Sequence, residues 1–235
     1  GEVVGLVGAN GCGKSTLLKL LIGELSLSAG QISLGEYGYL AQDASLGDLG
    51  KSLEQIFEER FEVEDWRGDL ALEIADLKLT DKKDSLSSLS GGQRTRLGLG
   101  LILARASLPE CLILDEPTNN LDKEGLKWLK RVLSGFRGGV LIASHERTFL
   151  DEVVQRIVAI EDKKLANYGG GYSLYLEQLT PKKELLTKEY ENYLSEVSKL
   201  TKFVKRTQDL NSKTSNEAYN KVKHESRTAF GYDKW

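Results

Sequence analysis

The sequence has 235 residues, of which 40% are hydrophobic and 29% are charged, as is typical of proteins that bury a core of ordinary size. Its net charge of −3 is too small to identify a partner. Its two cysteines, Cys12 and Cys111, are too few for a disulfide framework or a zinc site, and because a chain without disulfides fits a reducing compartment, we expect a cytoplasmic protein. No apolar run approaches the roughly 18 residues that span a bilayer, and no signal peptide is visible, so we expect no membrane insertion. Because the chain lacks methionine and starts inside a strand-like run, we interpret it as a fragment.

Strand and helix signals alternate along most of the chain. Short apolar runs predict buried strands at residues 3–7, 31–34, 38–40, 111–114 and 139–143, and a hairpin at residues 156–160 and 165–168. Apolar positions at helical spacing predict helices at residues 14–22, 53–62, 70–77, 94–106 and 123–133. Two glycines, Gly98 and Gly100, weaken the fourth of these helices by about 1 kcal/mol each. The alternation indicates an α/β fold with a parallel sheet covered on both faces.

The pattern changes after Tyr175, where strand signals stop. Apolar residues then recur at steps of three and four, at Leu186, Tyr190, Tyr193, Val197, Leu200 and Val204. This heptad seam predicts a coiled-coil-like helix that needs a partner helix, with a turn at residues 211–216 and a returning helix at residues 220–229. Twelve basic residues face eight acidic ones after Thr180, which favours either a solvated helical face or a surface that meets a polyanion.

A glycine-rich segment, residues 8–16, joins the first predicted strand to the first predicted helix. It fits the pattern G-x-x-x-x-G-K-[ST], in which backbone N–H groups and a helix N-terminus surround phosphate oxygens. The residues that we assign to phosphate binding are Gly8, Asn10, Gly11, Cys12, Gly13, Lys14, Ser15 and Thr16. We expect Lys14 to reach the β- and γ-phosphates and Ser15 to ligate Mg²⁺. The flanking strand and helix disfavour a chance glycine-rich turn.

Two acids, Asp115 and Glu116, end an apolar strand. A carboxylate at the end of a buried strand beside a phosphate loop can hold Mg²⁺ directly or through water, and we assign that role to Asp115. Glu116 is placed to orient or deprotonate the attacking water. An acidic turn after a core strand would be the simpler interpretation if the phosphate loop were absent.

A second candidate anion site precedes the predicted helix at residues 94–106. Ser90 is a candidate cap for that helix, and Gly91 and Gly92, followed by Gln93, expose further backbone N–H groups. Because one phosphate loop already serves one nucleotide, we expect this second site to serve a nucleotide on another domain. Without the other motifs, a capped helix and nothing more would be the favoured interpretation.

These three motifs in this order resemble an ATP-binding-cassette (ABC) ATPase over about residues 1–168. The resemblance implies a P-loop NTPase fold, with an ABC nucleotide-binding domain at residues 1–176 and a helical subdomain at about residues 43–106. It implies ATP and Mg²⁺ as cofactors, and ATP hydrolysis in a site that a second cassette completes. It also implies that Gln42 senses Mg²⁺ and water, that His145 contacts the γ-phosphate, and that Asp122 ends a loop that crosses to the opposite cassette.

Residues 116–122, 144–150 and 168–175 are similar to the ABC-F proteins, which are factors with two cassettes joined by a helical linker. Asn120, Glu146 and Thr148 depart from that family's usual histidine, aspartate and tyrosine. The resemblance implies that residues 177–235 are a truncated interdomain linker, that the second cassette lies beyond Trp235, and that the adenine-stacking aromatic lies upstream of Gly1. It also implies a ribosome-associated translation or antibiotic-resistance factor whose basic linker approaches the ribosome and tRNA.

The main alternative is the ATPase subunit of an ABC membrane transporter, which uses the same catalytic residues. The Asn119-Asn120 loop and the heptad linker argue against it, because a transporter subunit needs neither. A chromosome-maintenance ATPase and an inert scaffold remain further alternatives. The short interval between the phosphate loop and Asp115 disfavours the first, and the intact Lys14 and Glu116 disfavour the second. The sequence leaves open whether the ribosomal role is throttling, rescue, drug resistance or assembly.

Overall fold

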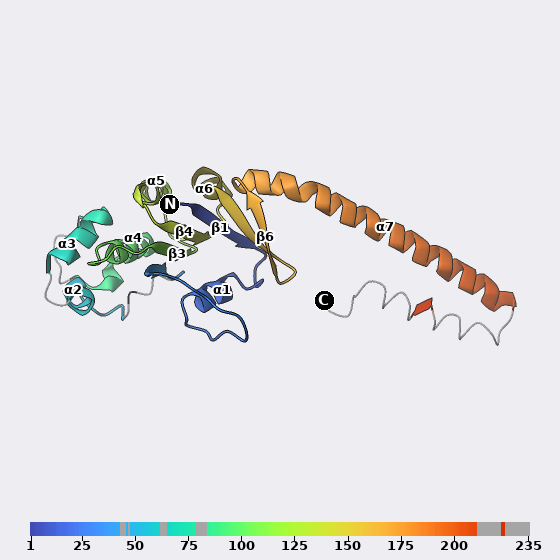
Figure 1. Cartoon of the computed structure of the whole chain (residues 1–235), viewed down its shortest axis with the longest axis horizontal. Coiled ribbons are helices and arrows are strands. Elements are labelled where there is room, and N and C mark those ends of the chain that lie inside the picture. Colours follow the sequence, from blue (N-terminus) through green and yellow to red (C-terminus); the bar gives the residue numbers. More distant parts are fainter. Residues whose placement is uncertain (43–45, 47, 62–64, 79–83, 211–221, 224–235) are drawn as a thin grey trace. The chain divides into compact units, whose positions relative to one another are not determined.

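The structure is a computed structural model that describes residues 1–42, 46, 48–61, 65–78, 84–210 and 222–223. The chain divides into two compact units, Gly1–Leu176 and Glu177–Trp235. The first unit is a mixed α/β domain, as predicted (Figure 1). Within the described residues, no helix has both the length and the apolarity to cross a membrane.

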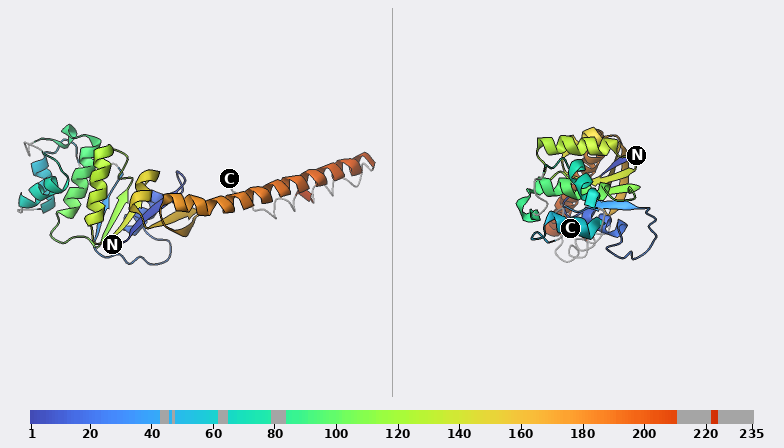
Figure 2. Two further views of the ribbon diagram at one scale, coloured as in Figure 1. Left: turned by 90° about the horizontal axis from the view of Figure 1, so that it is seen from above. Right: turned by 90° about the vertical axis from the view of Figure 1, so that its left-hand side faces the viewer.

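A six-stranded sheet organises the first unit, in the order β2-β3-β4-β1-β5-β6. The sheet and the helices around it can be seen in Figure 1 and Figure 2. The strands are β1 (Val3–Gly8), β2 (Tyr37–Leu40), β3 (Cys111–Asp115), β4 (Gly139–Ala143), β5 (Arg156–Glu161) and β6 (Lys164–Gly169). All neighbouring pairs are parallel except β5 and β6, which form the predicted hairpin. Since parallel strands need crossovers, the helices between them lie on the faces of the sheet.

Both faces of this sheet are covered. Helix α1 (Lys14–Leu21) lies on one face, and α5 (Lys123–Gly135) and α6 (Arg147–Val153) lie on the other (Figure 1). Leu6 packs in one buried cluster with Leu18 of α1, whereas a Cβ at the preceding Gly5 would lie 3.5 Å from Leu150 of α6. Successive residues of β1 therefore face opposite layers, which explains why its sequence is continuously apolar rather than alternating.

Three helices, α2 (Leu53–Phe61), α3 (Asp65–Ile74) and α4 (Gly91–Leu103), form a helical subdomain with a core of its own. A short 3-10 helix, Leu86–Ser88, precedes α4. Gly98 and Gly100 of α4 have a packing role that helix propensity does not show. A Cβ at Gly100 would lie 2.3 Å from the carbonyl oxygen of Ala71 in α3, and a Cβ at Gly98 would lie 2.8 Å from the side chain of Leu40. Close approach of α4 to α3 and β2 therefore requires small residues at these positions.

Several predicted boundaries were wrong. Residues 31–34 form no strand, since no described strand pairs with them and a strand without a partner gains no ladder of hydrogen bonds. The third and fourth predicted helices begin and end earlier than expected, at the bounds of α3 and α4. Helix α6 was not predicted at all, because seven residues are too few to show a period. The predicted turn at 211–216 and returning helix at 220–229 lie outside the described residues, apart from residues 222–223, which are helical.

The heptad segment is helical, as predicted, within α7 (Tyr172–Leu210). Tyr190, Leu194 and Leu200 on this helix are each more than 40% exposed. The helix continues through Pro181, whose missing N–H leaves the carbonyl of Glu177 without its usual i+4 donor. The boundary between the two compact units falls at the same turn, between Leu176 and Glu177.

Candidate nucleotide-binding site

The carboxyl ends of three adjacent strands bring the candidate residues to one edge of the sheet. In the register of the sheet, Leu6 of β1 and Asp115 of β3 both pair with Ala143 of β4. The phosphate loop follows β1, Glu116 follows β3 and His145 follows β4, so segments far apart in sequence begin at one level. Ligands of open α/β sheets bind in this position, just outside the carboxyl ends of the strands.

The phosphate loop has a backbone that only glycine accommodates well. Gly11 and Gly13 adopt φ values of 76° and 106°, in the left-handed region, and a Cβ at Gly8 would lie 2.5 Å from the sulfur of Cys12. Gly13 caps α1 without any side-chain hydrogen bond, and the first turn of α1 holds no acidic residue. The first N–H groups of α1 are therefore available to an anion rather than to a capping side chain.

Lys14 is the cation of this loop. Its Nζ donates to the carbonyl oxygens of Gly8 at 2.9 Å and Ala9 at 3.3 Å, and the residue is buried although its neighbours Ser15 and Thr16 are exposed. The loop thus bends back over the ammonium group. A buried ammonium held by two neutral carbonyls keeps a net positive charge for which a phosphate is the matching partner.

Asp115 is a buried carboxylate with unused hydrogen-bonding capacity. Only 4% of the residue is exposed, and its Oδ1 accepts no hydrogen bond from the described part of the chain. Such an orphaned anionic oxygen is costly unless a cation or water meets it. Among the described residues no cluster of three or more His, Cys, Asp or Glu side chains could hold a metal by itself. That pattern fits Mg²⁺, which one or two protein oxygens hold together with phosphates.

Glu116 and His145 form the closest pair of titratable groups at this edge. Nε2 of His145 lies 2.8 Å from Oε1 of Glu116, and the backbone N–H of His145 donates to Oε2 at 3.3 Å. Glu116 is 5% exposed, and this burial raises the pKa of its carboxyl group above the ordinary value of 4.5, against the opposing effects of His145 and Lys14. Its φ of 50° is unusual for a residue other than glycine. A bond from its N–H to the carbonyl of Ala143 holds that conformation, at 2.8 Å.

A buried hydroxyl pair, which the sequence did not single out, supports the loop after Glu116. Thr118 and Ser144 share a hydrogen bond of 2.9 Å, and both residues are buried. The bond ties the segment after β3 to the segment after β4. The signal available in the sequence was only that each residue follows a predicted strand by a few positions, which would not have distinguished it from a solvent-exposed loop residue.

The second candidate anion site is built as predicted at its helix cap. The hydroxyl of Ser90 accepts from the N–H of Gln93 at 3.2 Å, and the side chain of Gln93 accepts from the N–H of Ser90 at 2.8 Å, a complete capping box. The glycines between them contact the loop after Glu116, since a Cβ at Gly92 would lie 2.5 Å from the carbonyl oxygen of Asn120. The second candidate anion site therefore contacts the segment that follows Glu116, while its own amides lie at the start of α4.

Two further predicted site residues, Gln42 and Asp122, make no contact with Glu116 or His145 that the structure describes. Gln42 is exposed, two residues beyond β2, at the same edge of the sheet. Asp122 caps α5, where its carboxylate accepts from the N–H of Gly125 at 2.8 Å.

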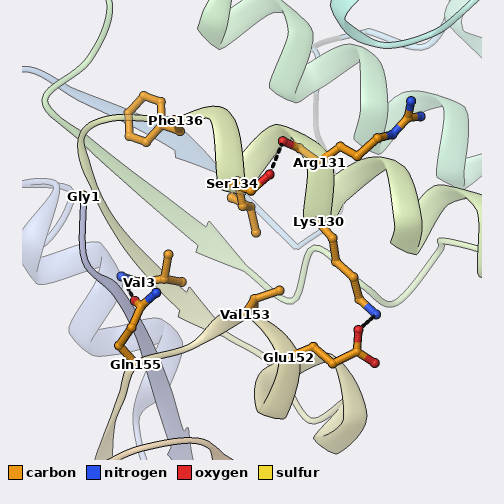
Figure 3. A pocket seen from close by; sticks show the side chains of 10 residues that line it. Gly1, Val3, Lys130, Arg131, Ser134, Phe136, Glu152, Val153 and Gln155 are labelled. Carbon is orange, nitrogen blue, oxygen red and sulfur yellow. Dashed lines mark hydrogen bonds and ion pairs between the residues drawn. The ribbon is translucent and has the colours of Figure 1, made fainter.

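A cavity of about 510 Å³ lies between α5, α6 and the start of β1 (Figure 3). It is at the opposite end of β1 from the phosphate loop, so it is not part of this site.

Curated relatives resemble the chain over most of its length. The ATP-binding protein YdiF of Bacillus subtilis is 35% identical over 86% of this chain and 38% of its own length. The tylosin resistance ATP-binding protein TlrC of Streptomyces fradiae is 32% identical over 85% of the chain and 44% of its own length. ABC transporter F family member 5 of Arabidopsis thaliana is 37% identical over 76% of this chain and 26% of its own length. The chain thus spans less than half the length of these relatives.

Solved structures and family models agree with the fold. A metal-chelate type ABC transporter matches with a TM-score of 0.60 and 25% identity, over 72% of both chains. The ATP-binding cassette MJ0796, in a dimer bound to ADP and phosphate, matches with a TM-score of 0.60 and 22% identity over 72% of this chain and 85% of that one, which supports the fold alone. The family model described as ABC transporter matches residues 1–119, and a second one of that description matches residues 158–227. The chain therefore belongs to the ABC transporter family and contains an ABC ATPase domain.

Proposed function

We propose that this chain binds ATP with Mg²⁺ at the edge formed by β1, β3 and β4 and contributes to hydrolysis of that ATP. The observation that carries the proposal is the pairing of Glu116 with His145 at 2.8 Å, on a buried carboxylate whose pKa also responds to the charge of Lys14. An acid, a potential donor and a phosphate-binding cation at one sheet edge are the parts that phosphoryl transfer to water needs.

The residues divide the work by position. The amides of residues 8–16 and the ammonium of Lys14 hold the phosphates, and Glu116 accepts a proton from the attacking water, for which its raised pKa suits it. His145 donates toward the charge that develops on the γ-phosphate. Ser15, Gln42 and Asp115 are the residues that would hold Mg²⁺. When bound, the cation would neutralise phosphate charge and align the leaving group.

A second cassette would complete the site. Ser90, Gly91, Gly92 and Gln93 present helix N-terminal amides, which we assign to the nucleotide of a partner cassette, and Asp122 ends the loop that we expect to cross to that partner. The solved structure of the MJ0796 cassette is a dimer bound to ADP and phosphate. In this chain the partner would be a second cassette of the same protein or another copy.

The composite site predicts that ATP turnover per chain rises with protein concentration, because one chain supplies the phosphate loop and another supplies the residues after Leu89. At a fixed low concentration of wild type, we expect added Lys14→Ala variant to raise phosphate release, since its second anion site is intact. The matched control is the double variant Lys14→Ala, Gly92→Asp, which should add nothing because the new side chain meets Asn120. Turnover that is independent of concentration and of both additions would contradict the composite site.

At the finer level, we propose that the chain is one cassette and the start of the linker of a cytoplasmic ABC-F protein that acts on the ribosome. Support comes from the relatives, which include two Arabidopsis thaliana proteins of the ABC transporter F family and the tylosin resistance protein TlrC. The twelve basic residues after Thr180 suit a surface that meets RNA phosphates. The alternative, a transporter subunit, would share the fold. It would not need the long helix α7, which therefore favours the ABC-F proposal.

The ribosomal proposal predicts that the Glu116→Gln form of the protein co-sediments with ribosomes when ATP is present, because ATP that is not hydrolysed holds the bound conformation. We expect this binding to weaken steeply as salt rises, since Lys and Arg contacts to phosphates release counterions. A Lys14→Ala, Glu116→Gln double variant should stay in the supernatant. The proposal loses its support if the single variant also sediments free of ribosomes with ATP.

A further inference from the structure

The loop after β6 and the first turn of α7 carry residues that the nucleotide site does not use. These residues all belong to the first compact unit: Tyr168, Gly170, Gly171, Tyr172, Ser173 and Tyr175. Helix α7 is 39 residues long, and the first four N–H groups of any helix lack partners within it. These groups need an acceptor from another part of the chain.

Asp151 of α6 provides that acceptor. Its Oδ2 accepts from the hydroxyl of Ser173 at 2.6 Å, and its Oδ1 accepts from the backbone N–H of Ser173 at 2.6 Å. These bonds hold the pKa of the Asp151 carboxyl below its ordinary value of 3.8, so the group is anionic at neutral pH and faces the positive end of α7. A Cβ at Gly171 would lie 2.7 Å from Oδ1, which explains the glycine just before the helix.

Aromatic packing strengthens the same junction. The buried ring of Tyr175 meets Tyr168 and Tyr172 edge to face, with centroids 4.9 and 5.6 Å apart. The guanidinium of Arg147 lies 5.7 Å from the ring of Tyr172. Arg147 is the first residue of α6, so the first turn of α7 is held from both ends of that short helix.

Helix α6 is in turn attached to the nucleotide site. It begins two residues after His145, the residue 2.8 Å from Glu116. Phe149 and Leu150 are 1% and 0% exposed, so α6 cannot unfold locally without exposing part of the core. Glu152 pairs with Lys130 of α5, the helix that Asp122 caps (Figure 3). Both segments that leave the catalytic edge therefore meet at α6.

We propose that α6 couples the nucleotide at His145 to the cap that Asp151 places on α7. The coupling rests on the proposed function, because its input is the γ-phosphate of ATP. Nε2 of His145 has two alternative anionic partners, the carboxylate of Glu116 and a γ-phosphate, and the exchange between them shifts the start of α6. A nucleotide changes an equilibrium only through such a difference in contacts. The Asp151–Ser173 bonds, at the other end of a seven-residue helix, change strength with it.

The test measures hydrogen exchange of the Tyr172 and Ser173 amides in the full chain, with and without an ATP analogue that is not hydrolysed, so that Glu116 keeps its carboxylate. ATP affinity is measured in parallel. We expect ATP to change exchange at these amides by about tenfold, the effect of gaining or losing a helix cap. Asp151→Ala should abolish most of this response, because it removes both acceptor oxygens, and Ser173→Ala about half, because it removes one of the two bonds. Asp162→Asn is the matched control, an exposed acid at the β5–β6 turn where asparagine tolerates the same positive φ.

The outcomes separate the coupling from the function on which it rests. A response that is lost in Asp151→Ala and kept in Asp162→Asn, at unchanged ATP affinity, supports the coupling. ATP binding without any response at these amides, or with a response that survives both Asp151→Ala and Ser173→Ala, overturns the coupling and leaves the proposed function standing. Failure of the parent protein to bind ATP overturns the proposed function, and the coupling falls with it.

Discussion

Replacing Glu116 by glutamine is expected to lower ATP turnover by about 10²–10⁴-fold, the contribution of a positioned general base, while ATP binding is retained. Glutamine keeps the shape of the buried side chain beside His145 but cannot accept a proton from water. Phosphate release and equilibrium ATP binding, measured on the same preparation, check both halves of the expectation. The matched control is Glu146→Gln, which changes an exposed acid one residue beyond His145 and should leave most of the turnover.

Wild-type ATP turnover should fall at low pH, and we expect protonation of the buried Glu116 carboxylate to cause this acidic limb of the pH profile. Burial raises the pKa of Glu116 above 4.5, so this group takes up a proton at a higher pH than an ordinary glutamate. The base is fully active above the raised pKa and is lost as the pH falls through it. Residual turnover of the Glu116→Gln variant should lack this limb. A variant that keeps about a tenth of the wild-type rate or more would exclude Glu116 as the base.

Replacing Gly100 by alanine is expected to destabilise the protein by about 1–3 kcal/mol, the usual cost of overpacking. Helix propensity alone predicts the opposite sign, since alanine is favoured over glycine in a helix by about 1 kcal/mol. The clash decides the sign, because the new Cβ would lie 2.3 Å from a backbone carbonyl, that of Ala71, which cannot rotate away as a side chain would. Urea or thermal unfolding monitored by circular dichroism measures the change.

Gly135 provides the control for this prediction. It ends α5, it is exposed, and a Cβ there would meet nothing within 4 Å. Gly135→Ala should therefore stabilise the protein by up to about 1 kcal/mol, as helix propensity predicts. Equal effects of the two substitutions, in either direction, would show that the contact between α3 and α4 does not decide the cost at Gly100.

The chemistry of the site was readable from the sequence where it depends on local geometry. The spacing of Gly8, Gly13 and Lys14 determines how a short loop presents its amides, and the capping box joins Ser90 to Gln93 across three residues. All six strands of the sheet were also predicted close to their bounds, because buried apolar runs between turns are strong local signals. The strand expected at residues 31–34 failed, since a strand depends on a partner and not only on its own residues.

Contacts between distant segments were decided by the tertiary structure. The pairing of Glu116 with His145 joins residues 29 apart, and only the register of β3 with β4 places them together. The packing of Gly100 on α3 and the cap from Asp151 to Ser173 are of the same kind, since neither glycine spacing nor a serine in a turn reveals what will face it. The sequence by itself thus determined the conformation of the loop that we propose for phosphate binding, because neighbouring residues set local conformation. Tertiary structure decided which side chains meet, because burial brings together groups that the chain keeps far apart.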